Sequence, residues 1–314
     1  MRDDVIVHRL KLRDLRILLA VTQAGSMAKA ATLLATSQPA VSRAIADMEA
    51  TLGVALLERS SQGVQPTPYG DALIKRGVAV FDELRQGVKD IDFIADPTAG
   101  EVKIGGTSST TAGIITTVIS RMSLKYSRVN FQVVTRPPST LLHELRERNL
   151  DMVISMTFDP VTDENIQSEI LYEDYLVIVA APNNPLARRR RVELADLVNE
   201  AWAMNETNAN TFLAAPLAEA FRAKGLEPPR VAVAGATGRL RDTLLATGRF
   251  ITTLPESLLH FPIKLTSLKR LPVDLPTTRG KTRIMTLKNR TLSPVAQLFI
   301  EFAREVAKPL AKRK

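Results

Sequence analysis

The sequence predicts an α+β protein built from several domains. Three closely spaced helical patterns lie near the start, a long uninterrupted helical pattern follows, and strands then alternate with helices to the end. A chain of 314 residues is also longer than one ordinary domain. We expect three regions, which cover residues 1–66, 67–96 and 97–314.

The composition excludes several classes of protein. The absence of cysteine excludes disulfides, thiolate nucleophiles, zinc fingers and a cysteine-based redox sensor. His8, His143 and His260 lie far apart without ligand-type spacing, so we interpret them as ordinary histidines and expect neither a metal nor a cofactor. No apolar run approaches the ~20 residues that span a bilayer, and the start resembles no signal peptide. We therefore expect a cytoplasmic protein without a membrane partner.

The net charge of +9 and the pI near 9.9 favour a polyanionic partner. The basic residues are nevertheless concentrated in Arg188 to Arg191, in 279–290 and in the tail, and not in the first seventy residues. Net charge therefore does not locate a DNA site. We interpret the arginine run as a solvated loop.

The first two helices are predicted from apolar spacing and from their ends. Leu15, Leu18 and Leu19 mark one face of a helix that ends at Gly25, where glycine relieves left-handed strain. Ser26 is expected to cap the second helix. Small alanines keep this second helix thin, as a close helix crossing requires.

A third helix begins after a short turn at Ala35-Thr36. The Ser37 hydroxyl is expected to cap it, and Pro39 is tolerated because first-turn amides need no intrahelical acceptor. Its buried stripe recurs at spacings of four, three and four: Val41, Ile45, Met48 and Leu52.

The opposite face of the third helix presents Gln38, Ser42 and Arg43. Glutamine and arginine bond adenine and guanine edges, and a helix amino terminus attracts phosphate. The alternative is a small helical hairpin with a polar outer face. We favour DNA recognition because a hairpin-like segment and a long helix follow.

Two short strands, 55–59 and 64–66, are predicted around Ser60 to Gly63, which would place Arg59 and Ser61 near a sugar-phosphate backbone. A plain surface hairpin is the alternative for this segment alone. Together with the helices it predicts a winged helix-turn-helix, whose expected DNA contacts are Ser26, Ser37, Gln38, Pro39, Ser42, Arg43, Arg59 and Ser61.

A single long helix is predicted from Thr67-Pro68 until Pro97. Its apolar residues repeat at spacings of three and four, a pattern that is typical of a coiled coil and predicts a dimer. Packing of this stripe on the chain's own core is the alternative. The expected dimer contacts are Ile74, Phe81, Leu84, Val88 and Ile91.

With these residues the chain resembles the LysR-type transcriptional regulators. The likeness is specific over the first seventy residues and more diffuse beyond Pro97, although it covers essentially the full length. Ala55-Leu56-Leu57 lacks the phenylalanine that often precedes the acidic-arginine pair, which affects packing only. The matching positions are Leu15, Ala28 to Leu34, Ser37 to Arg43, Glu49, Leu52-Gly53, Leu57, Glu58-Arg59 and Thr67 to Gly70.

Beyond Gly100, strands and helices alternate, which predicts a mainly parallel α/β architecture. The resemblance implies two lobes of the type 2 periplasmic-binding-protein fold: lobe 1 at about 97–171 plus 276–314, and lobe 2 at about 172–275. It places the crossings near Leu171 to Glu173 and near Leu275 to Arg283. The predicted strands are 101–105, 129–134, 152–155, 175–181, 201–204, 230–234 and 250–254, and the helices are 111–126, 139–148, 210–224 and 239–246.

Hydroxyl-bearing residues follow several predicted strands, where α/β sheets bind ligands. They would suit a carboxylate or another polar group, although simple helix capping explains each one equally well. The resemblance places an effector between the lobes, against Ser109 and Pro138-Ser139. The expected effector contacts are Thr107, Ser108, Ser109, Pro138, Ser139, Thr157, Asn205 and Thr207.

These features predict a DNA-binding transcriptional regulator that responds to a small anionic or polar metabolite. No nucleophile elbow, Walker loop, dinucleotide fingerprint or zinc motif occurs, so we expect no enzyme activity. A solute receptor and a metabolic enzyme are the alternatives. The expected partners are promoter DNA, the effector, RNA polymerase and a second copy of the chain, and the resemblance implies a tetramer formed from two dimers.

Overall fold

The computed structural model describes residues 2–60, 63–204, 214–236, 238–261, 267–275 and 278–312, with side chains from residue 6 onward except at 59 and 60. It divides into two compact units, Met1–Gln86 and Gly87–Lys314. Each unit is described by itself.

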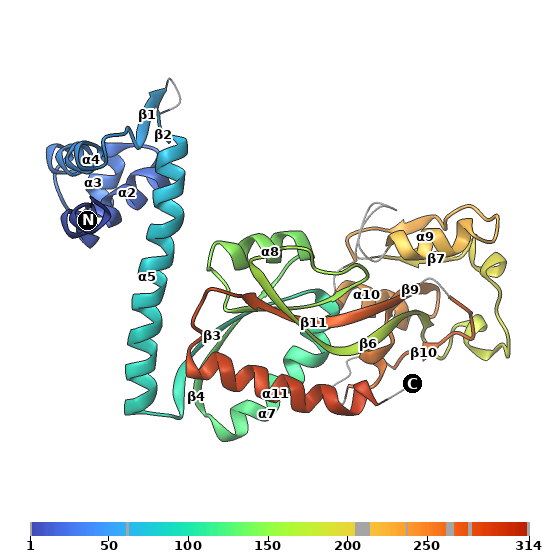
Figure 1. The fold of residues 1–314 in the computed structure, drawn as a ribbon. Helices are drawn as coiled ribbons and strands as arrows, with labels where there is room; N and C mark the ends of the chain where they lie inside the picture. The colour runs from blue at the N-terminus through green and yellow to red at the C-terminus, as the bar shows by residue number, and fades with distance from the viewer. Residues whose placement is uncertain are drawn as a thin grey trace. The chain divides into compact units, whose positions relative to one another are not determined.

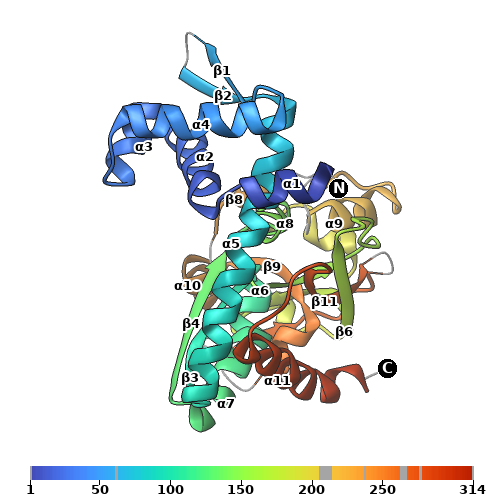
Figure 2. The same cartoon turned by 60° about the vertical axis from the view of Figure 1, so that its left-hand side comes forward.

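The first unit is a group of helices followed by a two-stranded antiparallel hairpin and the start of a long helix (Figure 1). The short helices α2 and α3 cross next to α4, and the hairpin projects beyond α4 (Figure 2). The elements are α1 (Arg2–Arg9), α2 (Leu12–Ala24), α3 (Met27–Leu33), α4 (Gln38–Leu52), β1 (Leu57–Ser60), β2 (Gly63–Pro66) and α5 (Pro68–Ala95).

The core of this unit uses the predicted faces of α3 and α4, but α2 buries a different face from the one predicted. Ile17, Leu18 and Val21 are buried, whereas Leu15 and Leu19 are only partly buried, because Leu15 lies against Gly77 of α5 instead. Ile17 and Leu18 of α2 pack with the small Ala30 and Ala31 of α3. Helix α4 contributes Val41, Ile45 and Met48, while Leu52 is partly buried against the same cluster. Burying this stripe fixes which face of α4 remains available to solvent.

The predicted helix ends are found, with one difference. Gly25 (φ 64°) and Gly53 (φ 74°) adopt the left-handed conformation after α2 and α4. Ser37 caps α4 by accepting a hydrogen bond from the Ala40 amide at 3.4 Å. Ser26 occupies the N-cap position of α3 with extended backbone, but its side chain makes no cap hydrogen bond, so the prediction that its hydroxyl caps this helix was wrong.

The second unit contains a β-sheet with both parallel and antiparallel strands, and helices cover its faces. Its strands are β3 (Ala99–Gly106), β4 (Arg128–Thr135), β5 (Met152–Thr157), β6 (Ile166–Ala180), β7 (Ala201–Ala203), β8 (Val231–Val233), β9 (Phe250–Pro255), β10 (Lys269–Arg270) and β11 (Arg279–Leu287). Its helices are α6 (Ser108–Thr110), the π-helix η1 (Thr111–Ile115), α7 (Thr116–Lys125), α8 (Pro138–Arg146), α9 (Ala214–Arg222), α10 (Gly238–Ala246), α11 (Pro294–Ala311) and the 3₁₀-helices η2 (Pro185–Arg188), η3 (Leu194–Leu197) and η4 (Glu256–Leu259).

The long strand β6 joins two halves of this sheet. The strand order is β4-β3-β5-β11-β6-β9-β7-β8, and β10 also pairs with β6. Residues 166–175 of β6 pair with β11, whereas residues 176–180 pair with β9. The change of partner therefore falls between Tyr175 and Leu176, a few residues after the predicted crossing at Leu171 to Glu173.

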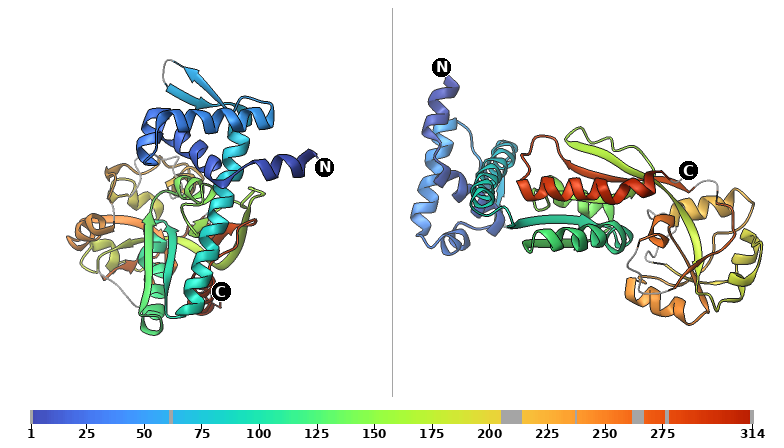
Figure 3. Two further views of the ribbon diagram at one scale, coloured as in Figure 1. Left: turned by 90° about the vertical axis from the view of Figure 1, so that its left-hand side faces the viewer. Right: turned by 90° about the horizontal axis from the view of Figure 1, so that it is seen from below.

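Each half has a core of its own, so the unit consists of two lobes (Figure 3). In the first lobe, α7 and α11 cover one face of the sheet with residues such as Val118 and Phe299, and α8 covers the other with Leu141 and Leu145. In the second lobe, Trp202 packs edge to face on Phe221, with the ring centroids 6.3 Å apart.

Two features of this unit differ from the sequence prediction. The sheet is mixed, because β11 is antiparallel to both β5 and β6 and β6 is antiparallel to β9. Strand β11, helix α11 and the first half of β6 were not predicted as separate elements. Polar residues such as Arg279 and Thr282 interrupt the apolar pattern of β11, which explains why the periodicity is weak there.

Candidate functional site

The amino-terminal end of α4 presents a polar surface to solvent. Ser37, Gln38, Pro39 and Arg43 are exposed, and Ser42 is partly buried. No carboxylate among the described residues of the first unit pairs with Arg43, so its guanidinium is available to an external group. The buried stripe on the other side of α4 holds this face outward.

Hydrogen bonds to backbone groups of the hairpin and its approach fix the hairpin against the helices. Oε1 of Glu49 in α4 accepts hydrogen bonds from the amides of Leu56 (2.7 Å) and Leu57 (3.2 Å). The Val64 amide donates to the Gly25 carbonyl at 3.0 Å, which joins β2 to the turn before α3. The hairpin therefore has a defined position relative to α4. Of the residues expected to contact DNA here, Arg59 has an undescribed side chain and Ser61 lies outside the described residues.

Helix α5 carries apolar side chains that the chain itself leaves exposed. Leu84 is 51%, Val88 58% and Ile91 67% exposed, although each is apolar. Ile94, which the predicted dimer contacts did not include, is 81% exposed. These residues recur at helical spacing, so they form one stripe, which we call the α5 stripe: Leu84, Val88, Ile91 and Ile94.

The two remaining dimer candidates lie closer to the chain's own residues. Ile74 packs against the core of the first unit, so at this position the helix packs on the chain's own core, which was the alternative to a dimer contact. Phe81 is partly buried. The exposed stripe therefore begins after them.

The carboxyl ends of β3 and β5 bring several hydroxyls together. Thr107 Oγ1 lies 3.1 Å from Thr110 Oγ1, and the Thr110 hydroxyl donates to the Ile154 carbonyl at 2.7 Å. Ser108 and Ser109 lie beside them in α6 and are partly exposed. Thr107 and Thr110 thus use their hydroxyls in structural hydrogen bonds, although Thr107 makes no side-chain cap hydrogen bond to α6, whereas Ser108 and Ser109 remain partly exposed.

The remaining effector candidates lie on neighbouring elements. Pro138 and Ser139 begin α8, where Ser139 is exposed and Pro138 partly buried. Thr157 is the last residue of β5. Asn205 and Thr207 lie outside the described residues.

Sequence reasoning missed a cation beside Thr157. Nε of Arg283, on β11, donates to Thr157 Oγ1 at 3.1 Å, and its Nη1 donates to Ser168 Oγ at 3.2 Å. The sequence signal for it is weak, because Lys281 and Arg283 recur at strand spacing but the polar Thr282 lies between them, and the pairing of this segment with β5 is not written in the sequence.

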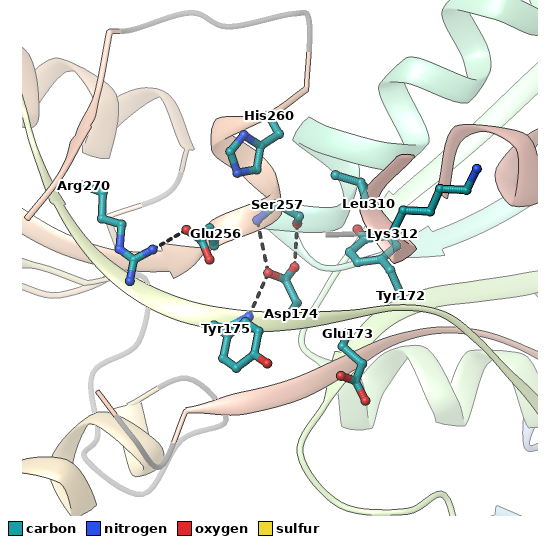
Figure 4. A pocket seen from close by; sticks show the side chains of 10 residues that line it. All are labelled: Tyr172, Glu173, Asp174, Tyr175, Glu256, Ser257, His260, Arg270, Leu310 and Lys312. Carbon is teal, nitrogen blue, oxygen red and sulfur yellow. Dashed lines mark hydrogen bonds and ion pairs between the residues drawn. The ribbon is translucent and has the colours of Figure 1, made fainter. Parts of the chain in front are cut away.

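A cavity of about 500 Å³ lies where β6 passes between the lobes (Figure 4). Its walls come from β6, from η4 and the adjacent His260, from Arg270 of β10, and from the end of α11. The expected effector contacts that the structure describes do not line it. The lining residues are Tyr172, Glu173, Asp174, Tyr175, Glu256, Ser257, His260, Arg270, Leu310 and Lys312.

The Asp174 carboxyl ties the crossing strand to η4. Its oxygens accept hydrogen bonds from Ser257 Oγ (2.5 Å), the Ser257 amide (3.1 Å) and the Tyr175 amide (2.9 Å). Burial raises the pKa of Asp174 from 3.8 to about 6, although the Ser257 hydrogen bonds act in the opposite direction. Burial also raises the pKa of Tyr172, and the nearby Asp174 charge adds to this effect.

A second cavity, of about 430 Å³, lies in the second lobe between the chain after the arginine run and Pro272 to Asp274. Its described lining includes no expected site residue. Among the described residues, no group of histidine and acidic side chains has the arrangement of a metal site, and no helix is long and apolar enough to cross a membrane.

Comparison with known proteins assigns both units to domains of one protein family. Residues 12–71 match the family described as bacterial regulatory helix-turn-helix protein, lysR family, and residues 95–308 match the LysR substrate binding domain. The chain belongs to the LysR family. Like its relatives it is a DNA-binding transcriptional regulator, with an effector-binding domain after the helix-turn-helix.

The similarity to relatives extends over nearly the whole chain. The transcriptional dual regulator GltC of Bacillus subtilis is 28% identical over 300 residues, which cover 93% of this chain and 96% of GltC. The regulator GbpR of Azospirillum brasilense is 26% identical over 306 residues, covering 97% of this chain and 89% of GbpR.

Solved structures show the same fold. A full-length variant of OxyR from Pseudomonas aeruginosa superposes with a TM-score of 0.66 at 16% identity and covers 97% of this chain and 99% of its own. The LysR regulator CbnR in complex with its target DNA gives a TM-score of 0.61 at 19% identity, covering 95% of this chain and all of its own (100%). The arrangement of a winged helix-turn-helix, a long helix and a two-lobed α/β domain is therefore confirmed.

Proposed function

We propose that this LysR regulator reads a promoter as a dimer through the exposed end of α4, and that a small anionic or polar effector bound in the second unit changes this binding. The observation that supports it most is the geometry of α4. Its buried stripe fixes the helix, while Gln38, Ser42 and Arg43 remain on the side that the core does not cover. We assign residues 1–66 to DNA binding, 67–96 to dimerisation and 97–314 to effector binding.

Chemistry supports the assignment of roles on α4. Gln38 and Arg43 carry the donors and acceptors that read base edges in the major groove. Ser37 and Ser42 offer hydroxyls near the helix amino terminus, where the backbone amides favour phosphate. The proposed interface is completed by contacts to the sugar-phosphate backbone of DNA or by packing contacts. The residues proposed for these contacts are Ser26, Pro39, Arg59 and Ser61. The structure of CbnR with its target DNA is consistent with a DNA-reading role for this fold.

The effector is proposed to bind at the carboxyl ends of β3, β4 and β5, between the lobes. Open α/β sheets bind ligands at this edge, and hydroxyls or amides there suit polar oxygen atoms. The proposed contacts are Thr107, Ser108, Ser109, Pro138, Ser139, Thr157, Asn205 and Thr207. The ligand must favour one assembly state over another, because equal affinity would leave DNA binding unchanged.

The α5 stripe supports the proposed dimer, because an exposed apolar row at this spacing is stabilised by burial against a second helix. We further propose that two dimers form a tetramer, that the DNA-bound form contacts RNA polymerase, and that the protein acts in the cytoplasm, where promoters are read. We expect no catalysis: the gathered hydroxyls bond one another and backbone carbonyls, with no described base positioned to activate them.

Fluorescence anisotropy with a labelled fragment of the promoter beside the protein's own gene tests this function. We expect nanomolar binding that weakens with salt and that a scrambled fragment of equal length does not reproduce. Equal affinity for both fragments at every salt concentration would reduce the interaction to nonspecific attraction and would contradict the proposal.

A further inference from the structure

Strand β11 presents two cations on one face of the first lobe. Lys281 pairs with Thr157 of β5 and Arg283 pairs with Ser155. Because the two basic residues are two positions apart in a strand, their side chains lie on the same side of the sheet. Both residues are partly buried. Neither forms an ion pair with a carboxylate in the part of the chain that the structure describes.

The Arg283 guanidinium is held by neutral groups alone. It donates to the hydroxyls of Thr157 and Ser168, at 3.1 and 3.2 Å, which leaves its other N–H groups without a partner among the described residues. An arginine stays charged at all relevant pH values, and withdrawing that charge from water costs free energy unless an anion compensates it. The buried Arg290 of this unit has such an anion, because it lies 2.9 Å from Asp151.

The position of the guanidinium is as informative as its charge. Thr157 is the last residue of β5, so a side chain that reaches its hydroxyl lies at the carboxyl end of the strand. Strand β3, which is followed by the hydroxyl residues Thr107 to Thr110, is the neighbour of β5. Arg283 therefore lies at the sheet edge where the effector is proposed to bind.

We infer that Arg283, assisted by Lys281, anchors a carboxylate group of the effector at this edge. This inference rests on the proposed effector site and makes it more specific, because it names the ligand's charged group and the residue that recognises it. A planar guanidinium bonds a carboxylate through two parallel N–H groups, and the Thr157 and Ser168 hydroxyls keep the arginine side chain in place for that contact.

The inference is tested with simple acids and their uncharged amides. The purified protein is titrated at constant ionic strength with acetate, succinate, benzoate and citrate, with acetamide, succinamide and benzamide, and with inorganic phosphate, while the melting temperature is recorded. We expect at least one carboxylate to raise the melting temperature saturably while its amide does not. Equal effects of acids and amides, no effect of any acid, or a response to phosphate alone would overturn the inference.

Variants assign the effect to Arg283. R283Q should weaken the carboxylate's affinity by at least about tenfold, R283K should retain part of it, and K281Q should weaken it less than R283Q does. The matched control is R279Q, which removes the same charge from the same strand at a position where Glu173 already pairs with the arginine. Unchanged carboxylate affinity in R283Q, with R279Q behaving identically, would overturn the assignment.

The melting temperature of each ligand-free variant reports whether it folds. Promoter affinity without ligand separates this inference from the proposed function, because R283Q should bind the promoter as the unaltered protein does. Sequence-specific DNA binding together with no carboxylate response would remove only the Arg283 inference. Loss of specific DNA binding by the unaltered protein would contradict the proposed function itself.

Discussion

Oε1 of Glu49 lies 2.7 Å from the backbone nitrogen of Leu56, so the carboxylate on α4 accepts a hydrogen bond from the residue that leads into the hairpin. The Leu57 amide donates to the same oxygen at 3.2 Å. Leu56 is itself buried in the core of the first unit. Together with the hydrogen bond from the Val64 amide to the Gly25 carbonyl, this side chain therefore holds the hairpin against the helix that we propose to read DNA.

Replacing Glu49 by alanine should destabilise the first unit and weaken promoter binding. Two partly buried amides would lose their acceptor, which costs on the order of 1–3 kcal/mol. The measurement is the melting temperature together with promoter affinity. E49Q, which keeps an acceptor oxygen, should lie between E49A and the unaltered protein; a fully stable E49A with normal promoter affinity would show that the hairpin is held in other ways.

Replacing Arg43 by alanine should weaken promoter binding without affecting folding. Arg43 is exposed on α4, and a base contact is worth about 1–3 kcal/mol, or roughly a tenfold to hundredfold change in affinity. S42A should have a smaller effect of the same kind. R222A, which removes the same charge from α9 in the second unit, is the control and should bind as the unaltered protein does. Equal losses for R43A and R222A would indicate a general charge effect.

The α5 stripe should be required for dimerisation. Replacing Val88 and Ile91 together by lysine puts charges into the proposed contact, which burial would strongly disfavour. Light scattering after size exclusion should then report a smaller assembly. D92K adds the same net charge at an exposed position of α5 and should leave the mass unchanged. A double variant with the mass of the unaltered protein would exclude this stripe from the interface.

The buried Asp174 should make the stability of the second unit depend on pH. Its pKa is raised from 3.8 to about 6, mainly by burial, so the folded form binds the proton more tightly than the unfolded form. Proton binding by Asp174 therefore stabilises the folded unit, and this stabilisation is complete below about pH 4. It is lost as pH rises through about 6, which lowers the free energy of unfolding by at most about 3 kcal/mol.

Asp174→Asn removes this titration while retaining an oxygen that can accept from Ser257. Calorimetric melting from pH 4 to 7.5 should show D174N gaining stability relative to the unaltered protein as pH rises. The control E219Q changes an exposed acidic group in α9 outside the cavity. Parallel melting curves for D174N and the unaltered protein would contradict a raised pKa at Asp174.

The winged helix-turn-helix was predictable because its signals are local. Gly25 and Gly53 mark helix ends, Ser37 supplies a cap, and the α4 stripe repeats at helical spacing; the structure contains each of these. Such features depend on neighbours within a few residues, which the sequence displays directly.

The parts of the second unit that escaped prediction depend on distant residues. Strand β6 is one continuous element that serves two lobes. Its change of partner at Tyr175 is set by β9 and β11, which come roughly 75 and 100 residues later in the chain. The contact of Arg283 with Thr157 likewise joins residues 126 positions apart. A single sequence carries no pairing register, so neither the cavity beside Asp174 nor this cation could be located beforehand.

Footprinting of the purified protein on the promoter region beside its own gene tests the central claim most directly. We predict two protected half-sites whose centres lie ~10 base pairs apart, or a multiple of that spacing, with protection lost in R43A and kept in R222A. No protected stretch with the unaltered protein, whether or not the carboxylate probes are present, would contradict the claim that α4 docks on specific DNA.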